Sequence, residues 1–349
     1  MFTIKSYRRW LRASIVIIYL IIIAGAVVRM TGSGMGCPDW PKCFGYWIPP
    51  TEETELEFSP DTHYKKGMVI IINEELRVAR EDFFTGNTYQ EIDWKPYIKH
   101  DYSVFNKFHT WTEYINRLIG ALGGLVVLFT AVVSLQFWRS RKKLTILTVV
   151  ALLAMLIQAV IGKIVVDTLL SPVLITIHMI VALLIVGLLI YLLHEVLPVD
   201  SRYYNKGNLS RWMLIIIAMT FIQVAMGTQV RQYIDHQVDL FGYPLSSAWL
   251  ENGPLIFLIH RSYSILLVLV HIAVSYIAIK KYKHPKRSYF SLNALILITI
   301  LSGVLMNYVD FPLGSQAAHL VTASLILGLQ FYLWMRLRTA ARLSVAATS

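Results

Sequence analysis

The stretch HTWTEYINRLIGALGGLVVL, residues 109–128, begins with polar and charged side chains and continues into an apolar run typical of a membrane helix. Seven further stretches are as apolar and as long. An α-helix of ~20 residues crosses the ~30 Å hydrocarbon layer of a bilayer. We therefore predict an all-α membrane protein with eight transmembrane helices. The predicted spans are 13–29, 108–137, 144–166, 173–195, 212–230, 254–279, 291–309 and 315–335.

Composition and charge agree with a membrane location. The 349 residues are 56% hydrophobic and only 15% charged, which excludes an ordinary soluble domain. With eight spans, the main groups of Lys and Arg, such as RSRKK (139–143) and KKYKHPKR (280–287), fall on one side. By the positive-inside rule we expect both termini in the cytoplasm and the protein in the cell inner membrane. The net charge of +11 then reflects topology and contact with membrane lipid, and no nucleic-acid partner is expected.

The first loop, from about 30 to 107, holds more than half of the acidic residues and is expected to form a small folded cap on the extracytoplasmic side. Both cysteines of the chain, Cys37 and Cys43, lie at its start in GSGMGCPDWPKCFG (32–45). On that side of the membrane they are away from cytosolic reductants, so we predict a disulfide between them. The alternative is a pair of unlinked thiols, whereas a zinc site would need more ligands than these two.

An internal repeat organises the chain. GAVVR (25–29) recurs as GTQVR (227–231), and INRLIG (115–120) aligns with IHRSYS (259–264), so that Asn116 corresponds to His260. His178 follows Gly162 by sixteen residues, and His319 follows Gly303 by the same interval. We predict two tandem, pseudo-symmetric four-helix bundles. The predicted boundaries are 1–196 for the N-terminal bundle with its large loop, 197–211 for a cytoplasmic linker and 212–349 for the C-terminal bundle.

The second bundle carries a histidine pair at matching depth on two helices, His260 and His319. Such a pair is the usual way to hold a haem through both axial positions, and ionisable residues inside spans are usually functional. The alternative is a pair of interhelical hydrogen bonds. Four arginines lie at the outer ends of spans and would suit haem propionates, unless they reach lipid headgroups instead. They are Arg231 and Arg261 in the second bundle and Arg29 and Arg117 in the first.

The first bundle differs at its ligand positions. It keeps His178 but has Asn116 where the second bundle has His260, and it gains Glu113 on the same helical stripe as His109. A buried carboxylate beside a macrocycle with one histidine ligand favours chemistry over electron storage. The alternative is an ion pair of Glu113 with Arg117 or His109 that stabilises the helix end.

These motifs resemble the haem A synthase family over all eight spans. The resemblance rests on GAVVRMTGSG (25–34), CPDWPKC (37–43), the spacing of Glu113 and Arg117, and the three histidines named above. It implies an enzyme that oxidises a methyl group of haem O, by successive hydroxylation, to the formyl group of haem A for terminal oxidases. It also implies a haem b cofactor on His260 and His319, substrate haem O in the N-terminal bundle, and Glu113 as the catalytic residue.

The chain departs from the family motif at one position, where Asn116 replaces a histidine. His178 is then the expected ligand of the substrate iron. Either His109 supplies the second ligand, or the iron is five-coordinate or water-bound with Asn116 as a hydrogen-bond partner, since a neutral amide is a poor ligand. An upstream synthase that delivers haem O is implied. The electron acceptor and a homo-oligomeric state stay open.

Two other functions compete with this interpretation. A di-haem b-type membrane electron-transfer protein would carry similar histidine pairs in both bundles, and a transporter would carry polar residues near the middle of its spans. Asn116, Glu113 and the aliphatic span centres argue against both. One further histidine, His271, lies eleven residues after His260, but the position eleven after His319 is Gln330. We therefore predict that His271 is a hydrogen-bonded core residue.

Overall fold

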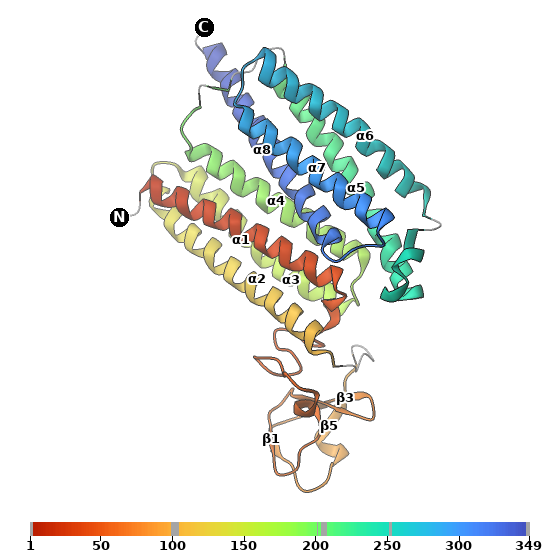
Figure 1. The fold of residues 1–349 in the computed structure, drawn as a ribbon. Coiled ribbons are helices and arrows are strands. Elements are labelled where there is room, and N and C mark those ends of the chain that lie inside the picture. Colours follow the sequence, from red (N-terminus) through yellow and green to blue (C-terminus); the bar gives the residue numbers. More distant parts are fainter. Residues whose placement is uncertain (1–2, 99–104, 201, 204–207, 251–252, 347–349) are drawn as a thin grey trace. The chain divides into compact units, whose positions relative to one another are not determined.

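The structure is a computed structural model that describes residues 3–98, 105–200, 202–203, 208–250 and 253–346. Its long α-helices are shown in Figure 1. They are α1 (Ile4–Met30), α2 (Lys107–Ser134), α3 (Lys142–Asp167), α4 (Pro172–Val196), α5 (Leu209–Phe241), α6 (Leu255–Tyr276), α7 (Lys286–Tyr308) and α8 (Ser315–Ala346). Shorter helical segments are η1 (Ser33–Met35), η2 (Glu53–Leu56), η3 (Glu91–Asp93), η4 (Leu135–Phe137), η5 (Tyr243–Leu250) and the π-helical η6 (Ile277–Lys281).

The predicted spans are confirmed, because all eight long helices are long and apolar enough to cross a membrane. The chain is thus a multi-pass membrane protein. Three helices are much longer than predicted: α1 already begins at Ile4 and includes the basic residues near the N-terminus, α5 continues to Phe241, and α8 continues to Ala346. Prolines mark several helix starts, as expected from their fixed φ and missing N–H. The predicted linker 197–211 lies partly outside the described residues.

Contacts divide the chain into two compact units. The larger unit comprises Met1–Ala26, Gly123–Leu156 and Met179–Ser349, and the smaller comprises Val27–Leu122 and Ile157–His178. Each unit contains its own set of the predicted site residues. His260 and His319 belong to the larger unit, whereas Glu113 and His178 belong to the smaller one.

The larger unit has two hydrophobic cores. The first is built mainly from α1 to α4, with Tyr7 and Leu11 of α1 and Leu189 of α4 fully buried. Polar groups inside it are paired between helices: the Tyr7 and Thr148 hydroxyls lie 2.5 Å apart. The second core is built from α5 to α8, with Met213 of α5 and Leu333 of α8 among its buried members. Each set of four helices therefore contributes most of the residues of one core.

The smaller unit contains the segment between α1 and α2, which we call the cap (residues 31–98 and 105–106). The cap includes short strands that the sequence did not predict (Figure 1). The strands are β1 (His63–Tyr64), β2 (Val69–Ile72), β3 (Glu75–Ala79), β4 (Phe83–Phe84) and β5 (Trp94–Pro96). β1 pairs with β4, and β3 lies between β2 and β5, all antiparallel. The two-residue turn Asn73–Glu74 has positive φ at both positions, which suits a tight hairpin.

Two small apolar clusters hold the cap together. One contains the cysteines together with Phe44, Leu56 and Val69. The other is centred on Trp94, which is 1% exposed and packs edge-on against the Tyr64 ring at 5.0 Å. A cap of this size buries little apolar surface, so a covalent link contributes a large share of its stability.

Candidate functional site

The two histidines of the C-terminal half, His260 on α6 and His319 on α8, face each other with ring centroids 6.3 Å apart. The ring of His319 is oriented by α7, because its Nδ1 lies 2.9 Å from the carbonyl of Thr299 and 3.1 Å from the hydroxyl of Ser302. A carbonyl oxygen can only accept, so Nδ1–H donates to it. The other ring nitrogen, Nε2, is left as the basic one that could bind a metal.

The spacing of these two rings fits one iron between them. Imidazole nitrogens bind metals at about 2 Å, so two rings on opposite sides of one metal have centroids about 6 Å apart. In the described part of the chain, no three His, Cys, Asp or Glu side chains gather around a common metal position. A haem needs only two protein ligands, because the macrocycle supplies the other four. The pair His260 and His319 therefore suits a haem.

Each of the three predicted ligand histidines lies against a glycine of a neighbouring helix. A Cβ on Gly227 would crowd the imidazole of His260, whereas a Cβ on either of the other two glycines would make an ordinary contact with the ring. The pairs, with the distance from imidazole Cε1 to a Cβ placed on the glycine, are Gly227 with His260 at 3.2 Å, Gly303 with His319 at 3.4 Å and Gly162 with His178 at 3.5 Å. This arrangement of a glycine beside the imidazole ring is shared by all three predicted ligand histidines.

Two glutamines contact the same histidines. Gln158 of α3 donates its Nε2–H to the main-chain carbonyl of His178 at 2.8 Å, and Gln223 of α5 does the same to the carbonyl of His260 at 3.0 Å. The Nε2 of Gln223 also lies 3.4 Å from Nε2 of His260. The Nδ1 atoms of His178 and His260 are buried and have no hydrogen-bond partner. Neither glutamine was predicted from the sequence to contact a histidine, although QAVIG (158–162) and QVAMG (223–227) share the pattern Gln-x-x-x-Gly.

The two arginines predicted to bind haem propionates in the C-terminal half, Arg231 and Arg261, both contact other side chains of the protein. Arg231 forms an ion pair with Asp235 at 2.8 Å and a hydrogen bond with Gln316 of α8. The guanidinium of Arg261 lies 5.8 Å from the centre of the Phe257 ring, in cation–π geometry. Their predicted contacts with haem propionates stay a prediction.

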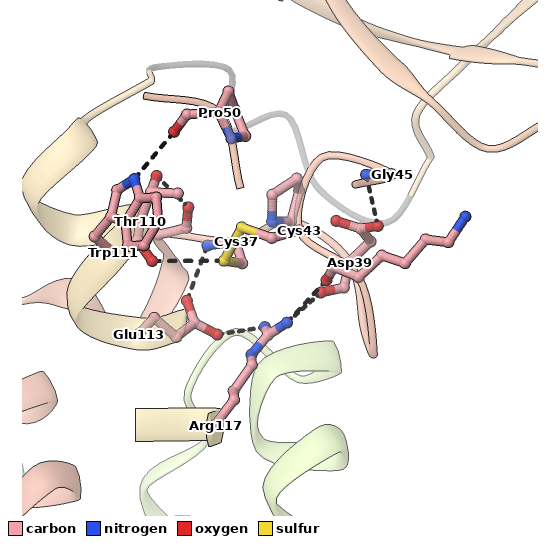
Figure 2. Close-up of a disulfide and its surroundings, with 12 residues drawn as sticks. Cys37, Asp39, Cys43, Gly45, Pro50, Thr110, Trp111, Glu113 and Arg117 are labelled. Atoms are coloured by element: carbon pink, nitrogen blue, oxygen red, sulfur yellow. Dashed lines mark hydrogen bonds and ion pairs between the residues drawn. A yellow bond between two sulfur atoms is a disulfide. The ribbon is translucent and has the colours of Figure 1, made fainter. Parts of the chain in front are cut away.

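Glu113 is buried in the smaller unit, with 3% of its surface exposed, and faces the disulfide loop (Figure 2). Its Oε2 accepts the main-chain N–H of Cys37 at 2.9 Å, and its Oε1 forms an ion pair with Arg117 one turn later. The ion pair with Arg117, which the sequence offered as an alternative role, is thus present. His109 is not a partner of this carboxylate.

Arg117 connects α2 to the same loop. Its Nη1 donates to the carbonyl oxygens of Asp39 at 2.7 Å and Lys42 at 2.9 Å, both of which lie between the cysteines (Figure 2). Cys37 and Cys43 form the predicted disulfide. Earlier on α2, the Thr110 hydroxyl donates to the carbonyl of Gly36 at 2.8 Å. The guanidinium predicted to bind a propionate is therefore already bound to the loop.

Asp39 is half-buried, and its carboxyl group lies inside this loop. Its Oδ2 accepts the N–H of Gly45 at 2.9 Å, whereas its Oδ1 is buried without a hydrogen-bond partner. Burial raises the pKa of the Asp39 carboxyl above its ordinary value, and the N–H of Gly45 and the charge of Arg117 offset this only in part. Asp39 was not among the residues predicted for the site, and no pattern in the sequence shows that its carboxyl lies inside the loop.

The remaining candidate residues of the substrate half lie on α1 and α2. His109 is half-buried with its ring against Phe108, at 6.0 Å between centroids. Asn116 is also half-buried, and a Cβ on Gly120 one turn later would meet no other atom within 4 Å. Arg29 lies in the last turn of α1.

The prediction for His271 is confirmed. It is 1% exposed, its Nδ1 lies 2.7 Å from the carbonyl of Leu267, and its Nε2 lies 2.7 Å from Nε2 of Gln330. Gln330 also donates to the hydroxyl of Thr220 at 2.9 Å. Both ring nitrogens are therefore used inside the helix bundle, as expected for a core histidine.

Comparison with known proteins gives consistent matches. A profile of the COX15-CtaA family, described as cytochrome oxidase assembly protein, matches residues 8–331. The heme A synthase of Bacillus licheniformis is 23% identical over 329 residues, which cover 89% of this chain and 89% of that protein. The heme A synthase of Bartonella bacilliformis is 24% identical over 369 residues, covering 97% and 94%. That of Shewanella oneidensis is 25% identical over 219 residues, covering 62% of this chain but only 54% of the relative.

Proposed function

The chain belongs to the COX15-CtaA family of cytochrome oxidase assembly proteins, and from this membership we propose that it is a haem A synthase. The family match agrees with the resemblance found in the sequence. The proposed reaction oxidises a methyl group of haem O, by successive hydroxylation, to the formyl group of haem A. Relatives named heme A synthase that align over most of this chain support the proposal.

The observation that carries the proposal is the facing pair of His260 and His319, with ring centroids 6.3 Å apart. We assign these residues as the axial ligands of a haem b cofactor, which would supply one-electron redox chemistry. The chain's own part is to hold the two rings in place: Gly227 leaves space for the ring of His260, and the Thr299 carbonyl orients His319.

Haem O is the proposed substrate of the N-terminal half, with His178 as its ligand. Support comes from the setting of His178, which repeats that of His260: a glycine beside the ring, a glutamine on the main-chain carbonyl and a buried Nδ1 without a partner. The second ligand position has Asn116 instead of histidine. His109 as a replacement ligand, or Asn116 as a hydrogen-bond partner of a bound water, are the two arrangements to be distinguished.

Glu113 is the proposed catalytic carboxylate. The Cys37 N–H and the Arg117 guanidinium fix its orientation. Each carboxylate oxygen has two lone pairs, so Glu113 can still accept a hydrogen bond from a water or a hydroxyl of the substrate. In this role it would position or deprotonate water near the reacting carbon.

The location and organisation of the chain follow from the same proposal. We place it in the cell inner membrane with both termini cytoplasmic and the cap outside, and the disulfide supports an oxidising compartment for the cap. The two predicted bundles, 1–196 and 212–349, are supported by the separate cores of α1–α4 and α5–α8. Haem O would come from an upstream synthase.

Pigment analysis of the purified protein tests the proposal. Expressed in a host that makes haem O but lacks its own haem A synthase, the chain should yield haem b together with haem A. Variants His260→Ala and His319→Ala should lose the low-spin haem b spectrum and stop haem A formation while still inserting into the membrane. Absence of haem A in a host with ample haem O, or a full bis-histidine spectrum in either variant, would refute the assignment.

A further inference from the structure

The settings of His178 and His260 share several contacts and differ in one, because only Gln223 also has its Nε2 near the ring, 3.4 Å from Nε2 of His260. In both, an amide nitrogen of a glutamine on the neighbouring helix donates to the main-chain carbonyl of the histidine. In both, the glycine four residues after the glutamine lies against the imidazole ring. The same two kinds of atom also lack partners although they are buried: Oε1 of Gln158 and Gln223, and Nδ1 of His178 and His260.

Buried polar atoms without partners are rare and call for an explanation. Here each orphaned pair consists of a strong acceptor, the amide oxygen, and a ring nitrogen that can carry a proton. The two belong to side chains already in contact, because the same amide holds the backbone of the same histidine. When the other ring nitrogen of a histidine binds a metal, the proton resides on Nδ1, and metal-bound histidines almost always donate it to an acceptor.

The repeat offers a comparison inside the chain. Aligning GAVVR (25–29) with GTQVR (227–231) places Ile21 at the position of Gln223, and the same repeat places Asn116 at the position of His260. Where the histidine is absent, the glutamine is absent too. His319 occupies the position of the second repeat that corresponds to His178. Its Nδ1 has a different acceptor, the main-chain carbonyl of Thr299. Thr299 lies four residues before Gly303, as each glutamine lies four before its glycine.

We propose that Gln158 and Gln223 are positioning residues for the two haem ligands His178 and His260, each fixing the histidine backbone through its amide nitrogen and accepting Nδ1–H through its amide oxygen once iron is bound. This inference rests on the proposed function. It makes Gln-x-x-x-Gly on one helix, facing a histidine on the next, the arrangement that forms two of the three histidine ligand positions proposed in this chain. A neutral acceptor at Nδ1 makes the imidazole a better donor to iron without adding a buried charge.

The test replaces each glutamine with methionine, which has a similar length but no amide. Loss of such a partner typically weakens metal binding 10–100-fold. Gln223→Met should therefore release haem b about tenfold faster to an acceptor protein, and should raise the midpoint potential of the haem that remains. Gln158→Met should weaken haem O binding by a similar factor and leave the spectrum and potential of haem b unchanged. Each variant would then weaken the binding of a different haem, a result that a general loss of helix packing would not produce.

Gln330→Met is the matched control for Gln223→Met. Gln330 is 0% exposed, lies in the same unit as Gln223 and contacts His271, which is not a proposed ligand. It should leave haem release and potential unchanged even if it lowers thermal stability. Equal haem release in Gln223→Met and Gln330→Met would overturn the inference while leaving the proposed function intact. If Gln223→Met does not accumulate, Gln158→Met decides by its haem O affinity. Unaltered protein without haem b would overturn the proposed function, and this inference with it.

Discussion

The Glu113 carboxylate accepts the main-chain N–H of Cys37 at 2.9 Å, so the proposed catalytic group is hydrogen-bonded directly to a residue of the disulfide. Arg117 completes the connection by binding Glu113 and two carbonyl oxygens of the loop between the cysteines. The position of the carboxylate thus depends on the loop, and the loop depends on the carboxylate. Variants of either one should reveal whether this arrangement serves catalysis, stability or both.

Glu113→Ala should leave haem b bound, because its proposed ligands His260 and His319 are on other helices. If Glu113 acts on the substrate, haem A formation should fall about 10²–10⁴-fold, the usual contribution of a positioned acid or base, and the alcohol intermediate should accumulate. Glu113→Gln keeps an oxygen for the Cys37 N–H and should be equally inactive but more stable. Haem A production at the normal rate in Glu113→Ala would leave Glu113 only as the structural partner of Arg117.

Cys37→Ser, alone or with Cys43→Ser, should loosen the cap. A cross-link closing so short a loop contributes about 2 kcal/mol by the chain-entropy argument. We expect the cap to unfold at a lower temperature and haem O to be retained less well. The rate at which bound haem O is converted should change less. Mass mapping without reductant should find the two cysteines linked in protein from its native compartment. Two free thiols there would contradict the assignment.

His109→Ala distinguishes the two arrangements at the substrate iron. If His109 is the replacement ligand, this variant should lose the six-coordinate spectrum of bound haem O. If Asn116 instead hydrogen-bonds a bound water, the spectrum should persist in His109→Ala, and Asn116→His should convert the substrate haem to a low-spin, bis-histidine form. Optical and electron paramagnetic resonance spectra of the haem O complex provide the measurement, with haem b as internal reference.

Gly227→Ala should disturb haem b, because the new Cβ would lie 3.2 Å from the imidazole of His260. Overpacking of this kind costs about 1–3 kcal/mol, and here it falls on a proposed ligand. Gly187→Ala on α4 is the control, since a Cβ there would meet no other atom within 4 Å. Haem b content per protein should fall in the first variant only. Equal content in both would show that the ring does not need this space.

Asp39→Asn should remove a pH dependence of the cap. Because burial raises the pKa of Asp39, the folded cap binds this proton more tightly than the unfolded chain does. The contribution of Asp39 to stability is therefore full below the ordinary pKa of 3.8 and is lost as the pH rises through the raised value. Asparagine keeps an oxygen for the Gly45 N–H without the charge, so the variant cap should be the more stable one at pH 7.

Hydrogen exchange of peptides covering the disulfide loop, corrected for intrinsic rates, measures this difference. Protection in the unaltered chain should decrease from pH 4 to pH 7 relative to Asp39→Asn. A constant ratio over that range would mean that the carboxyl does not titrate between the two states of the cap.

Much of this protein could be predicted from local sequence. The spans were predictable because a helix in a bilayer needs ~20 apolar residues, a requirement that composition alone reveals. The histidines 178, 260 and 319 stood out because an ionisable residue in a span is costly and because the internal repeat returns them at matching positions. The disulfide followed from two cysteines in one short loop. None of these inferences requires knowing which helix packs against which.

Only the tertiary structure decided what the polar side chains contact. Glu113 looked like a macrocycle partner by its helical stripe, and Arg117 looked like a propionate partner by its place at the outer end of a span. Yet both bind a loop more than 70 residues earlier in the chain. Gln158 and Gln223 were inconspicuous until their amides were found on the carbonyls of the histidines. Helical periodicity fixes the face on which a residue lies, but a hydrogen bond depends on the neighbour that folding brings to that face. The spans could therefore be predicted from the sequence, whereas the partners of the site residues could not.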